Sequence, residues 1–275
     1  MNHNIHSQID GNLGPQSGVN VSEGGHEQPA YSPTILCLHG WRSNNEVTKT
    51  HSRNLCLSRW YSGGVHYIEG SVQAPGPPDD ATDEFFDGPF FSWFETESHD
   101  AEEKMLQSMH AVIAYVKSHG PFDCAYGFSQ GGAMVALLSF PEIVFELTGA
   151  RMQLWRSVVL ACSTIIRARM IAEKLWNINL ENINIPVPSF HLIGMEDMLR
   201  QESEQAMRMF AYRRCSSVTA LHYLQHNPRQ KGTNAIIRSI YYIPGGHAVR
   251  FFSCFRAGFC PIRVLIRHTC RFHPH

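Results

Sequence analysis

Several signals are absent from this sequence of 275 residues, and each absence removes a class of protein. No basic, apolar leader opens the chain and no run of about 18 apolar residues occurs, so neither a secretory signal nor an ordinary membrane-spanning helix is expected. The 23 basic and 24 acidic residues leave a formal net charge of -1, which gives no reason to expect a nucleic-acid partner. No HExxH motif or carboxylate pair at metal spacing occurs, and we expect neither a metal nor a cofactor.

The eight cysteines form no CxxC pair. Several of them lie inside apolar runs, as buried free thiols do. A reducing compartment is therefore favoured over a disulfide-forming one. This usage of cysteine predicts a cytoplasmic protein, with the nucleus as a second location.

Three segments differ in composition. Residues 1–32 are rich in Gly, Asn, Ser and Gln and poor in large apolar side chains, so we expect a flexible tail. Residues 33–250 carry the apolar pattern of one folded domain. Residues 251–275 hold four arginines, three cysteines and no acidic residue. Two interpretations of this last segment stay open: a basic tail that binds a partner, and a stretch translated from an unspliced intron.

Short apolar runs alternate with helical patterns from Thr34 onward. We expect strands at 34–41, 65–71, 122–128, 157–163, 187–194 and 239–246, helices at 46–61, 99–120, 130–140, 165–176 and 198–214, and a long loop at 72–99. This order predicts an α/β fold whose mostly parallel sheet has helices on both faces. In such sheets ligands bind beyond the carboxyl ends of the strands, which makes the residues after each strand the candidates for a site.

Ser129 lies between an expected strand and an expected helix, in the stretch "CAYGFSQGGAMVALLSF". Glycines stand two residues before it and two and three residues after it. A strained turn between strand and helix exposes a serine hydroxyl only when such neighbours lack side chains. The helix that follows directs its free N–H groups and its dipole toward the serine. We therefore favour a catalytic nucleophile over a purely structural glycine corner.

A nucleophilic serine needs a base, and the base needs an acid that orients it. Asp197 follows the expected strand 187–194, and His247 follows the last expected strand, which gives the chain order Ser, Asp, His. Glu196 is the rival acid, but the offset from Gly194 favours Asp197. Among the 16 histidines, His247 stands apart because a glycine pair places it on a tight turn.

Acyl transfer also requires two backbone N–H donors for the oxyanion. The amide of Gln130 is the first candidate because it follows the nucleophile at the start of a helix. The loop after "LHG" is the expected source of the second donor, most simply the amide of Trp41. The alternative interpretation of "LHGW" is a plain strand end with a glycine turn. A cysteine nucleophile is a weaker hypothesis, since Cys124 precedes the turn inside a strand.

Five stretches together resemble the FSH-type serine hydrolases: "ILCLHGWRSN", "FDGPFFSWFE", "YGFSQGGAMVALL", "HLIGMED" and "YIPGGHAVR". The resemblance implies an α/β-hydrolase without a large cap domain that cleaves carboxylic esters or thioesters with Ser129, Asp197 and His247. Some fungal members resemble thioesterases that release acyl chains in secondary metabolism, and by analogy the partner is a small-molecule or carrier-bound acyl substrate. This chain departs from the family pattern at Arg250, where a proline is usual. The alternative function is a catalytically silent binding protein of the same fold.

The segment 77–103 holds ten acidic residues, no Lys or Arg, and a series of aromatic side chains. One interpretation is an acidic surface whose aromatic rings fill the edge of the core. The other is a wall of the acyl pocket, because binding sites are mostly apolar and are built on loops. The resemblance favours the second interpretation, and it assigns substrate contacts to Phe90, Phe91, Trp93 and Phe94.

Overall fold

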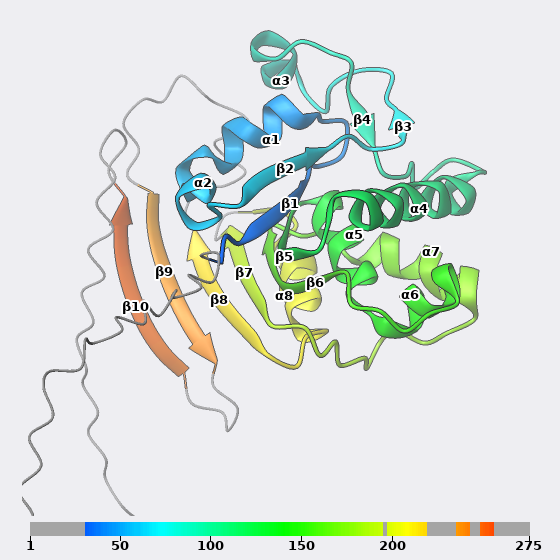
Figure 1. The fold of residues 1–275 in the computed structure, drawn as a ribbon. Helices are drawn as coiled ribbons and strands as arrows, with labels where there is room; N and C mark the ends of the chain where they lie inside the picture. Colours follow the sequence, from blue (N-terminus) through cyan, green and yellow to red (C-terminus); the bar gives the residue numbers. More distant parts are fainter. Residues whose placement is uncertain (1–30, 195–196, 219–234, 243–247, 256–275) are drawn as a thin grey trace, which may run out of the picture. The chain divides into compact units, whose positions relative to one another are not determined.

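The structure, a computed structural model, describes residues 31–194, 197–218, 235–242 and 248–255 (Figure 1). Every helix and strand in it belongs to the unit Ser32–His275. The helices, with η for a 3-10 helix, are α1 (Asn45–Ser52), η1 (Arg53–Leu55), α2 (Leu57–Trp60), α3 (Asp80–Phe85), α4 (Ala101–His119), α5 (Gln130–Leu138), α6 (Pro141–Thr148), α7 (Ile166–Trp176) and α8 (Arg200–Arg208). The strands are β1 (Thr34–Leu38), β2 (Gly64–Ile68), β3 (Val72–Gln73), β4 (Phe91–Ser92), β5 (Phe122–Phe128), β6 (Trp155–Ala161), β7 (Ser189–Gly194), β8 (Arg213–Val218), β9 (Ala235–Tyr242) and β10 (Ala248–Phe255).

One eight-stranded sheet organises the fold, in the order β10-β9-β8-β7-β6-β5-β1-β2. Strands β2, β1, β5, β6, β7 and β8 run parallel to one another, whereas β9 is antiparallel to β8 and β10 is antiparallel to β9. The mostly parallel sheet predicted from the sequence is confirmed. The chain passes from β1 outward to β2 and then back across β1 to β5, so the order reverses between β1 and β5. The loops that follow these two strands therefore meet at a switch point, where open α/β sheets bind ligands.

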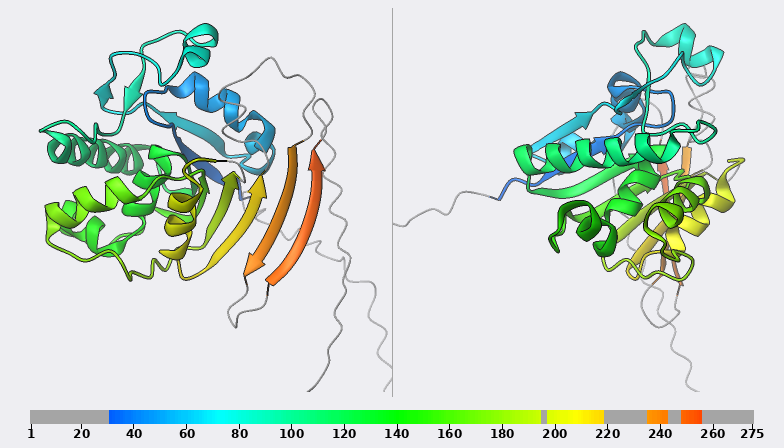
Figure 2. Two further views of the ribbon diagram at one scale, coloured as in Figure 1. Left: turned by 180° about the vertical axis from the view of Figure 1, so that it is seen from behind. Right: turned by 90° about the vertical axis from the view of Figure 1, so that its right-hand side faces the viewer.

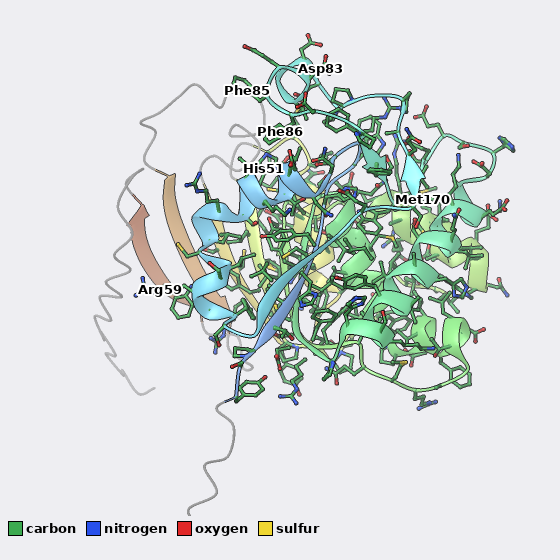
Figure 3. The ribbon with its side chains drawn as sticks, turned by 45° about the horizontal axis from the view of Figure 1, so that its top comes forward. His51, Arg59, Asp83, Phe85, Phe86 and Met170 are labelled. Atoms are coloured by element: carbon green, nitrogen blue, oxygen red, sulfur yellow. The ribbon has the colours of Figure 1, made fainter. Side chains whose placement is uncertain are left out.

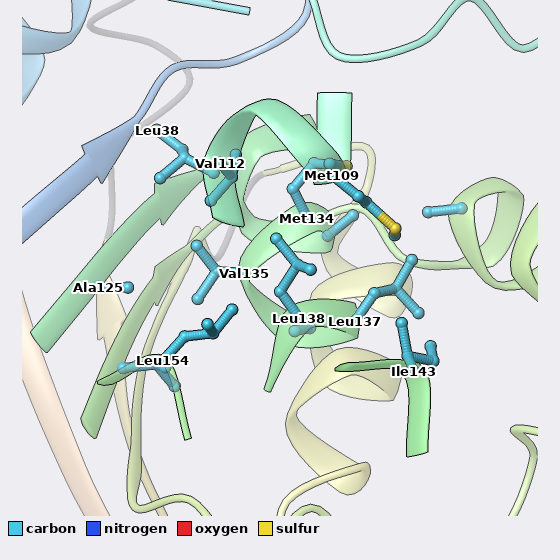
Figure 4. Packing of buried hydrophobic residues seen from close by; sticks show 14 of the residues in the cluster. Leu38, Met109, Val112, Ala125, Met134, Val135, Leu137, Leu138, Ile143 and Leu154 are labelled. Carbon is cyan, nitrogen blue, oxygen red and sulfur yellow. The ribbon is translucent and has the colours of Figure 1, made fainter. Parts of the chain in front are cut away.

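Helices cover both faces of the sheet, which the side views in Figure 2 let the reader follow. On one face, alternate strand residues such as Leu36 and Ala125 pack against α4, α5 and α7 in the larger core cluster (Figure 4). Helix α5 is buried on all sides, because its sequence QGGAMVALL carries no charge. On the other face a smaller cluster joins Cys37 and Tyr126 to Leu57 of α2. The two clusters fix the strand ends on which the site is built.

Some expected elements differ from the structure in their length. The single helix expected at 46–61 is broken into α1, η1 and α2, since Cys56 has a left-handed backbone with a φ of 50°. The helix expected at 198–214 ends at Arg208 and is followed by β8, whose sequence RRCSSV is too polar to mark a strand by hydrophobicity. The helix expected at 130–140 ends at Leu138 as α5, and Pro141 begins a further helix, α6, where the missing N–H of proline is harmless.

The segment expected as a loop at 72–99 contains regular structure. It forms β3, α3 and β4, and β3 pairs with β4 in an antiparallel two-stranded sheet. Helix α3 begins where the Asp79 carboxylate accepts a hydrogen bond from the backbone N–H of Thr82 at 2.8 Å. Within the described ranges we find no separate cap domain.

Strand β9 occupies part of the last expected strand, 239–246, and β10 includes the first five residues of the segment 251–275. No single helix in the described part of the chain is long and apolar enough to cross a membrane. Helices α5 and α6 have the length and apolar composition of a membrane span only when they are taken together, and the chain bends by 81° between them. The expected tail, residues 1–32, lies outside the described residues except for its last two members.

Candidate active site

Ser129 is the single residue between β5 and α5, and its backbone has a φ of 50° and a ψ of -115°. This is backbone that non-glycine residues rarely adopt, at a cost of about 1–3 kcal/mol, and it is typical of a nucleophile turn. Two hydrogen bonds hold the turn against the loop after β6: Ser129 donates its N–H to the Ala161 carbonyl at 2.9 Å, and its carbonyl accepts from Thr164 N–H at 3.2 Å. Ser129 is half-buried while its neighbours in sequence are buried, so the turn presents this one residue.

Close backbone contacts explain the glycines around Ser129. A Cβ on Gly127 would lie 2.5 Å from the carbonyl oxygen of Gly131, and a Cβ on Gly131 would lie 2.3 Å from the carbonyl oxygen of His39. A Cβ on Gly132 would lie 2.7 Å from the hydroxyl of Ser163. All three positions exclude a side chain, because α5 starts in contact with the ends of β1, β5 and β6. This is the steric requirement that the sequence predicted.

The amide of Gln130 is the first N–H of α5, and the leading N–H groups of a helix have no acceptor within it. It adjoins Ser129 at the positive end of the helix dipole, which is the position required of an oxyanion donor. The loop after β1 lies against the same serine, since a Cβ on Gly40 would stand 3.5 Å from the Ser129 Cβ. Both expected donor segments therefore border Ser129.

His39 fixes the direction of the peptide between Gly40 and Trp41. Its Nε2 accepts the backbone N–H of Gly70 at 2.7 Å, so the ring proton is on Nδ1, which donates to the Gly40 carbonyl at 2.7 Å. Carbonyl and N–H point in opposite directions across a trans peptide. The Trp41 N–H is consequently directed away from the His39 ring. The assignment of this N–H to the oxyanion stays a prediction.

Burial lowers the pKa of His39 to about 4, against the weaker opposing effect of its bond to Gly40. The ring is therefore neutral at pH 7, and the 3.6 Å approach of its Nε2 to the Glu69 carboxylate is not an ion pair. Burial also raises the pKa of Glu69, partly offset by the hydrogen bond from Asn45 N–H. His39 acts here as a neutral structural group beside the serine.

The side chain of Gln130 anchors the aromatic segment to the site. Its Oε1 accepts from the Trp93 N–H at 2.9 Å, and its Nε2 donates to the Phe94 carbonyl at 2.7 Å. The indole N–H of Trp93 donates to the His39 carbonyl at 2.8 Å. Nucleophile turn, aromatic segment and the loop after β1 thus share one hydrogen-bond network. No local sequence signal marks these bonds, because their partners lie 36 to 54 residues apart.

The four expected substrate residues differ in burial. Trp93 and Phe94 are 0% and 2% exposed and belong to the larger core cluster, and Phe90 is 5% exposed and packs with Val47. Phe91 is half-buried. The packing of Trp93 and Phe94 is thus accounted for by the core, as in the structural interpretation of this segment. An acyl-pocket role stays a prediction, with Phe91 the member best exposed to contact a substrate.

Two aromatic side chains outside the expected set lie near the nucleophile turn. His51, near the end of α1, places its ring centroid 5.5 Å from Phe128, the residue before Ser129. The His51 ring centroid also lies 6.5 Å from that of Phe86, which follows α3 (Figure 3). His51 comes from a segment that sequence analysis had not joined to the site, whereas Phe86 belongs to the aromatic segment 77–103.

Asp197 lies beyond β7 at the same edge of the sheet as Ser129, because β5, β6 and β7 are parallel and in register from Phe128 through Ala161 to Leu192. Asp197 is 9% exposed, and its Oδ1 accepts from the Leu199 N–H at 2.8 Å. Sequence analysis therefore placed this carboxylate at the correct edge. Its role as the acid of a triad is untested and stays a prediction.

The rival acid Glu196 and the expected base His247 lie outside the described residues. Strand β9 runs antiparallel to β8, and its last pairs, Arg214 with Tyr241 in β8–β9 and Tyr242 with Ala248 in β9–β10, lie toward the edge where the parallel strands begin. The expectation that the last strand ends at the edge of Ser129 is therefore wrong for β9. The assignment of the base remains a prediction from the sequence.

The described cysteines Cys37, Cys56, Cys124, Cys162 and Cys215 are free thiols, and all but Cys56 are buried. Burial raises the pKa of Cys124, which removes the thiolate that a cysteine nucleophile requires. Within the described ranges no group of three or more His, Cys, Asp or Glu could hold a metal ion. Two cavities of about 300 and 240 Å³ are lined by residues other than Ser129 and Asp197.

The parallel sheet, the switch point and the strained serine turn define an α/β-hydrolase. The family model described as serine hydrolase (FSH1) matches residues 30–234, and the chain belongs to this family. It is 32% identical to "Hydrolase phiM" of Talaromyces stipitatus over 45% of this chain and 50% of that protein. It is 31% identical to "Esterase C25G4.2" of Caenorhabditis elegans over 64% of this chain and 78% of that protein. The family resemblance stated from the sequence is thereby confirmed.

The solved structure titled "Crystal structure of esterase PE8" is similar at 17% identity with a TM-score of 0.43, covering 68% of this chain and 83% of that one. The chain spans half the length of phiM, and the family match ends before His247.

Proposed function

We propose that this chain hydrolyses carboxylic esters or thioesters of an acyl substrate with Ser129 as nucleophile, Asp197 as acid and His247 as base. The observation that carries the proposal is the strained turn at Ser129, at the sheet's switch point and at the N-terminus of the buried helix α5. A backbone strained at a switch point is the mark of a functional site.

In the first half of the reaction, His247 takes the proton of the Ser129 hydroxyl while the oxygen attacks the acyl carbon. The carbonyl oxygen becomes an oxyanion, to which the N–H groups of Gln130 and Trp41 donate. The tetrahedral intermediate then collapses, the bond from carbon to the leaving oxygen or sulfur breaks, and His247 returns the proton to the leaving group. Asp197 holds the imidazole and stabilises its charged form.

In the second half, water replaces the serine as nucleophile. His247 takes a proton from the water, the hydroxide adds to the acyl-enzyme, and Ser129 leaves with that proton. The products are a carboxylic acid and an alcohol or thiol. Release of carrier-bound acyl chains in secondary metabolism, in a cytoplasmic setting, is the thioester form of this proposal and rests on the resemblance to fungal members.

The test is covalent labelling of the purified protein with a fluorophosphonate, which an activated serine attacks at phosphorus. We expect one label, on Ser129, and no label on Ser129→Ala. Ser163→Ala is the matched control, since this buried serine lies beside the same turn. Absence of labelling on the folded wild-type protein would favour the silent binding protein instead, and undiminished labelling of Ser129→Ala would move the nucleophile elsewhere.

A further inference from the structure

Trp41, Arg42 and Ser43 lie in the loop after β1, and the aromatic segment accepts two of their three N–H groups. Arg42 donates its N–H to the Ser92 hydroxyl at 3.2 Å, and Ser43 donates its N–H to the Phe91 carbonyl at 2.9 Å. Arg42 is held in this way at a φ of 47°, a conformation that costs a non-glycine residue about 1–3 kcal/mol. Of the three N–H groups, only that of Trp41 has no acceptor among the residues that the structure describes, which leaves it for an acyl oxygen.

The carboxylate of Glu95 joins the side chains of this loop. Its Oε2 accepts the indole N–H of Trp41 at 3.1 Å, and its Oε1 accepts the hydroxyl of Ser92 at 2.8 Å. Oε1 also lies 3.9 Å from the Nε of Arg42, whose guanidinium carbon is 4.3 Å from the centroid of the Trp41 ring. The Glu95 side chain is only 22% exposed. One carboxylate therefore holds the Trp41 side chain directly and, through Ser92, the peptide that follows Trp41.

The position of Glu95 depends in turn on Gln130, the residue after the nucleophile. The Gln130 side chain accepts from the Trp93 N–H and donates to the Phe94 carbonyl, and Glu95 is the next residue. Trp93 and Phe94 are also packed in the larger core cluster, so the backbone that carries Glu95 is anchored on both counts. This short segment therefore connects the two residues expected to supply oxyanion donors, Gln130 and Trp41.

We propose that Glu95 is a positioning residue for the second oxyanion donor and that it acts by holding the Trp41 side chain. His39 already binds the carbonyl of the Gly40–Trp41 peptide, and Glu95 supplies the second restraint on the direction of the Trp41 N–H. This inference rests on the proposed function, in which that N–H donates to the oxyanion. Because the oxyanion forms only when the serine attacks, a misdirected donor slows turnover and changes substrate binding little.

Substitutions of Glu95 and Trp41 test this role together. Glu95→Ala removes both acceptor oxygens, and we expect its kcat to fall about tenfold at a nearly constant KM, less than the loss of about 10²–10³ when a whole oxyanion donor is removed. Glu95→Gln keeps an amide oxygen for the indole N–H and should retain most of the wild-type kcat. Trp41→Phe removes the indole N–H and should lower kcat less than Glu95→Ala does. The double variant should have the kcat of Glu95→Ala alone, since the two residues act as one unit.

Glu97→Ala is the matched control. Glu97 lies two residues further on, its side chain is 86% exposed, and it pairs with Arg167 at 3.3 Å. We expect this variant to keep the wild-type kcat. A wild-type kcat in Glu95→Ala, an equal loss in Glu95→Gln, or additive losses in the double variant would overturn the positioning role. A rise in KM at constant kcat in Glu95→Ala would also overturn it, because it would indicate direct contact with the substrate.

An inhibitor tests the oxyanion without turnover. The Ser129 oxygen adds to the carbonyl carbon of an alkyl trifluoromethyl ketone, its proton passes to His247, and the former carbonyl oxygen becomes an oxyanion beside the two donors. We expect the inhibition constant to rise about tenfold in Glu95→Ala, in parallel with the fall in kcat/KM, and to stay unchanged in Glu97→Ala. Equal inhibition constants in the wild type and Glu95→Ala would show that Glu95 does not act on the oxyanion. A folded wild-type protein whose Ser129 does not react with fluorophosphonate would instead refute the proposed function, which is a different outcome.

Discussion

Ser129 and Asp197 lie at the same edge of the sheet, but close steric contact holds the first and hydrogen bonds hold the second. Around Ser129, a Cβ at Gly127 or Gly131 would come within 2.5 Å of a backbone oxygen. Around Asp197, the carboxylate accepts from the Leu199 N–H at 2.8 Å, and the backbone N–H of Asp197 donates to the Gly194 carbonyl at 3.4 Å. Steric positions tolerate no substitution, whereas hydrogen-bonded ones tolerate substitutions that preserve the donor. The two regions should therefore respond differently to mutation, the first in stability and the second in rate.

The largest effect is expected on the hydrogen-bonded side. Asp197→Asn keeps the shape of the side chain and removes the charge that orients the base, so kcat should fall by about 10⁴, the scale known from serine proteases. The unfolding free energy should change little. Steady-state kinetics and urea unfolding on the same preparation measure both quantities.

Glu196→Gln is the control for this prediction, because Glu196 is the neighbouring carboxylate and the rival acid. We expect its kcat to stay close to the wild type. A severe loss in Glu196→Gln together with a mild one in Asp197→Asn would show that the acid had been assigned to the wrong residue.

The second effect is expected on the steric side. In Gly131→Ala the new methyl group would meet the carbonyl oxygens of His39 at 2.3 Å and Leu38 at 2.6 Å, both on backbone that cannot move without shifting β1. We expect a loss of about 3 kcal/mol in unfolding free energy, the upper range for overpacking. The control is Gly76→Ala, where a Cβ would meet no atom within 4 Å. Equal urea midpoints for the two variants would contradict the steric account.

The steric side was also the part of the site best predicted from sequence. The pattern of glycines around Ser129 records short-range contacts, and the strand before it and the helix after it are marked by apolar residues. The contacts of Gln130 with Trp93 and Phe94 join residues 37 and 36 positions apart, so no local pattern encodes them. Polar β8 was missed for the opposite reason, since its strand pairing is not accompanied by hydrophobic alternation.

Two buried histidines, His39 beside Ser129 and His191 in β7, make the unfolding free energy depend on pH. Burial lowers the pKa of His39 to about 4, and burial together with the charge of Arg213 lowers the pKa of His191, in β7, to about 3. The unfolded chain binds these protons near pH 6.5, above both folded-state values. Between pH 6.5 and 4 the unfolded state therefore binds more protons, and unfolding free energy should fall as the pH is lowered.

Urea unfolding between pH 4 and 7 measures this slope. His191→Asn should reduce it by the contribution of one proton, about 1.4 kcal/mol per pH unit at most, whatever its effect on stability at pH 7. Gln107→Ala, at an exposed position on α4, removes no titrating group and is the control, which should leave the slope unchanged. A slope in His191→Asn equal to the wild type would mean that this ring is protonated in the folded protein.

The smallest effect concerns substrate choice, and it depends on the aromatic segment that is hydrogen-bonded to Gln130 and His39. Phe91 is the suitable probe, because it is half-buried and its backbone exchanges hydrogen bonds of 2.7 and 2.9 Å with Ser43, in the loop after β1. Trp93 is unsuitable, since it is 0% exposed and its truncation would open the core.

An acyl chain that packs on Phe91 gains about 0.8 kcal/mol for each methylene buried. In the wild type, kcat/KM should therefore rise with acyl chain length and then level off, at low and at high salt alike, because burial is not a charge–charge interaction. Phe91→Ala should flatten this rise while preserving turnover of acetyl esters, and Phe145→Ala, at a 45% exposed position on α6, should not. If acetyl and longer acyl esters have equal specificity constants in the wild type, or if Phe91→Ala leaves the rise unchanged, the aromatic side chains serve only the core and the acyl chain binds elsewhere.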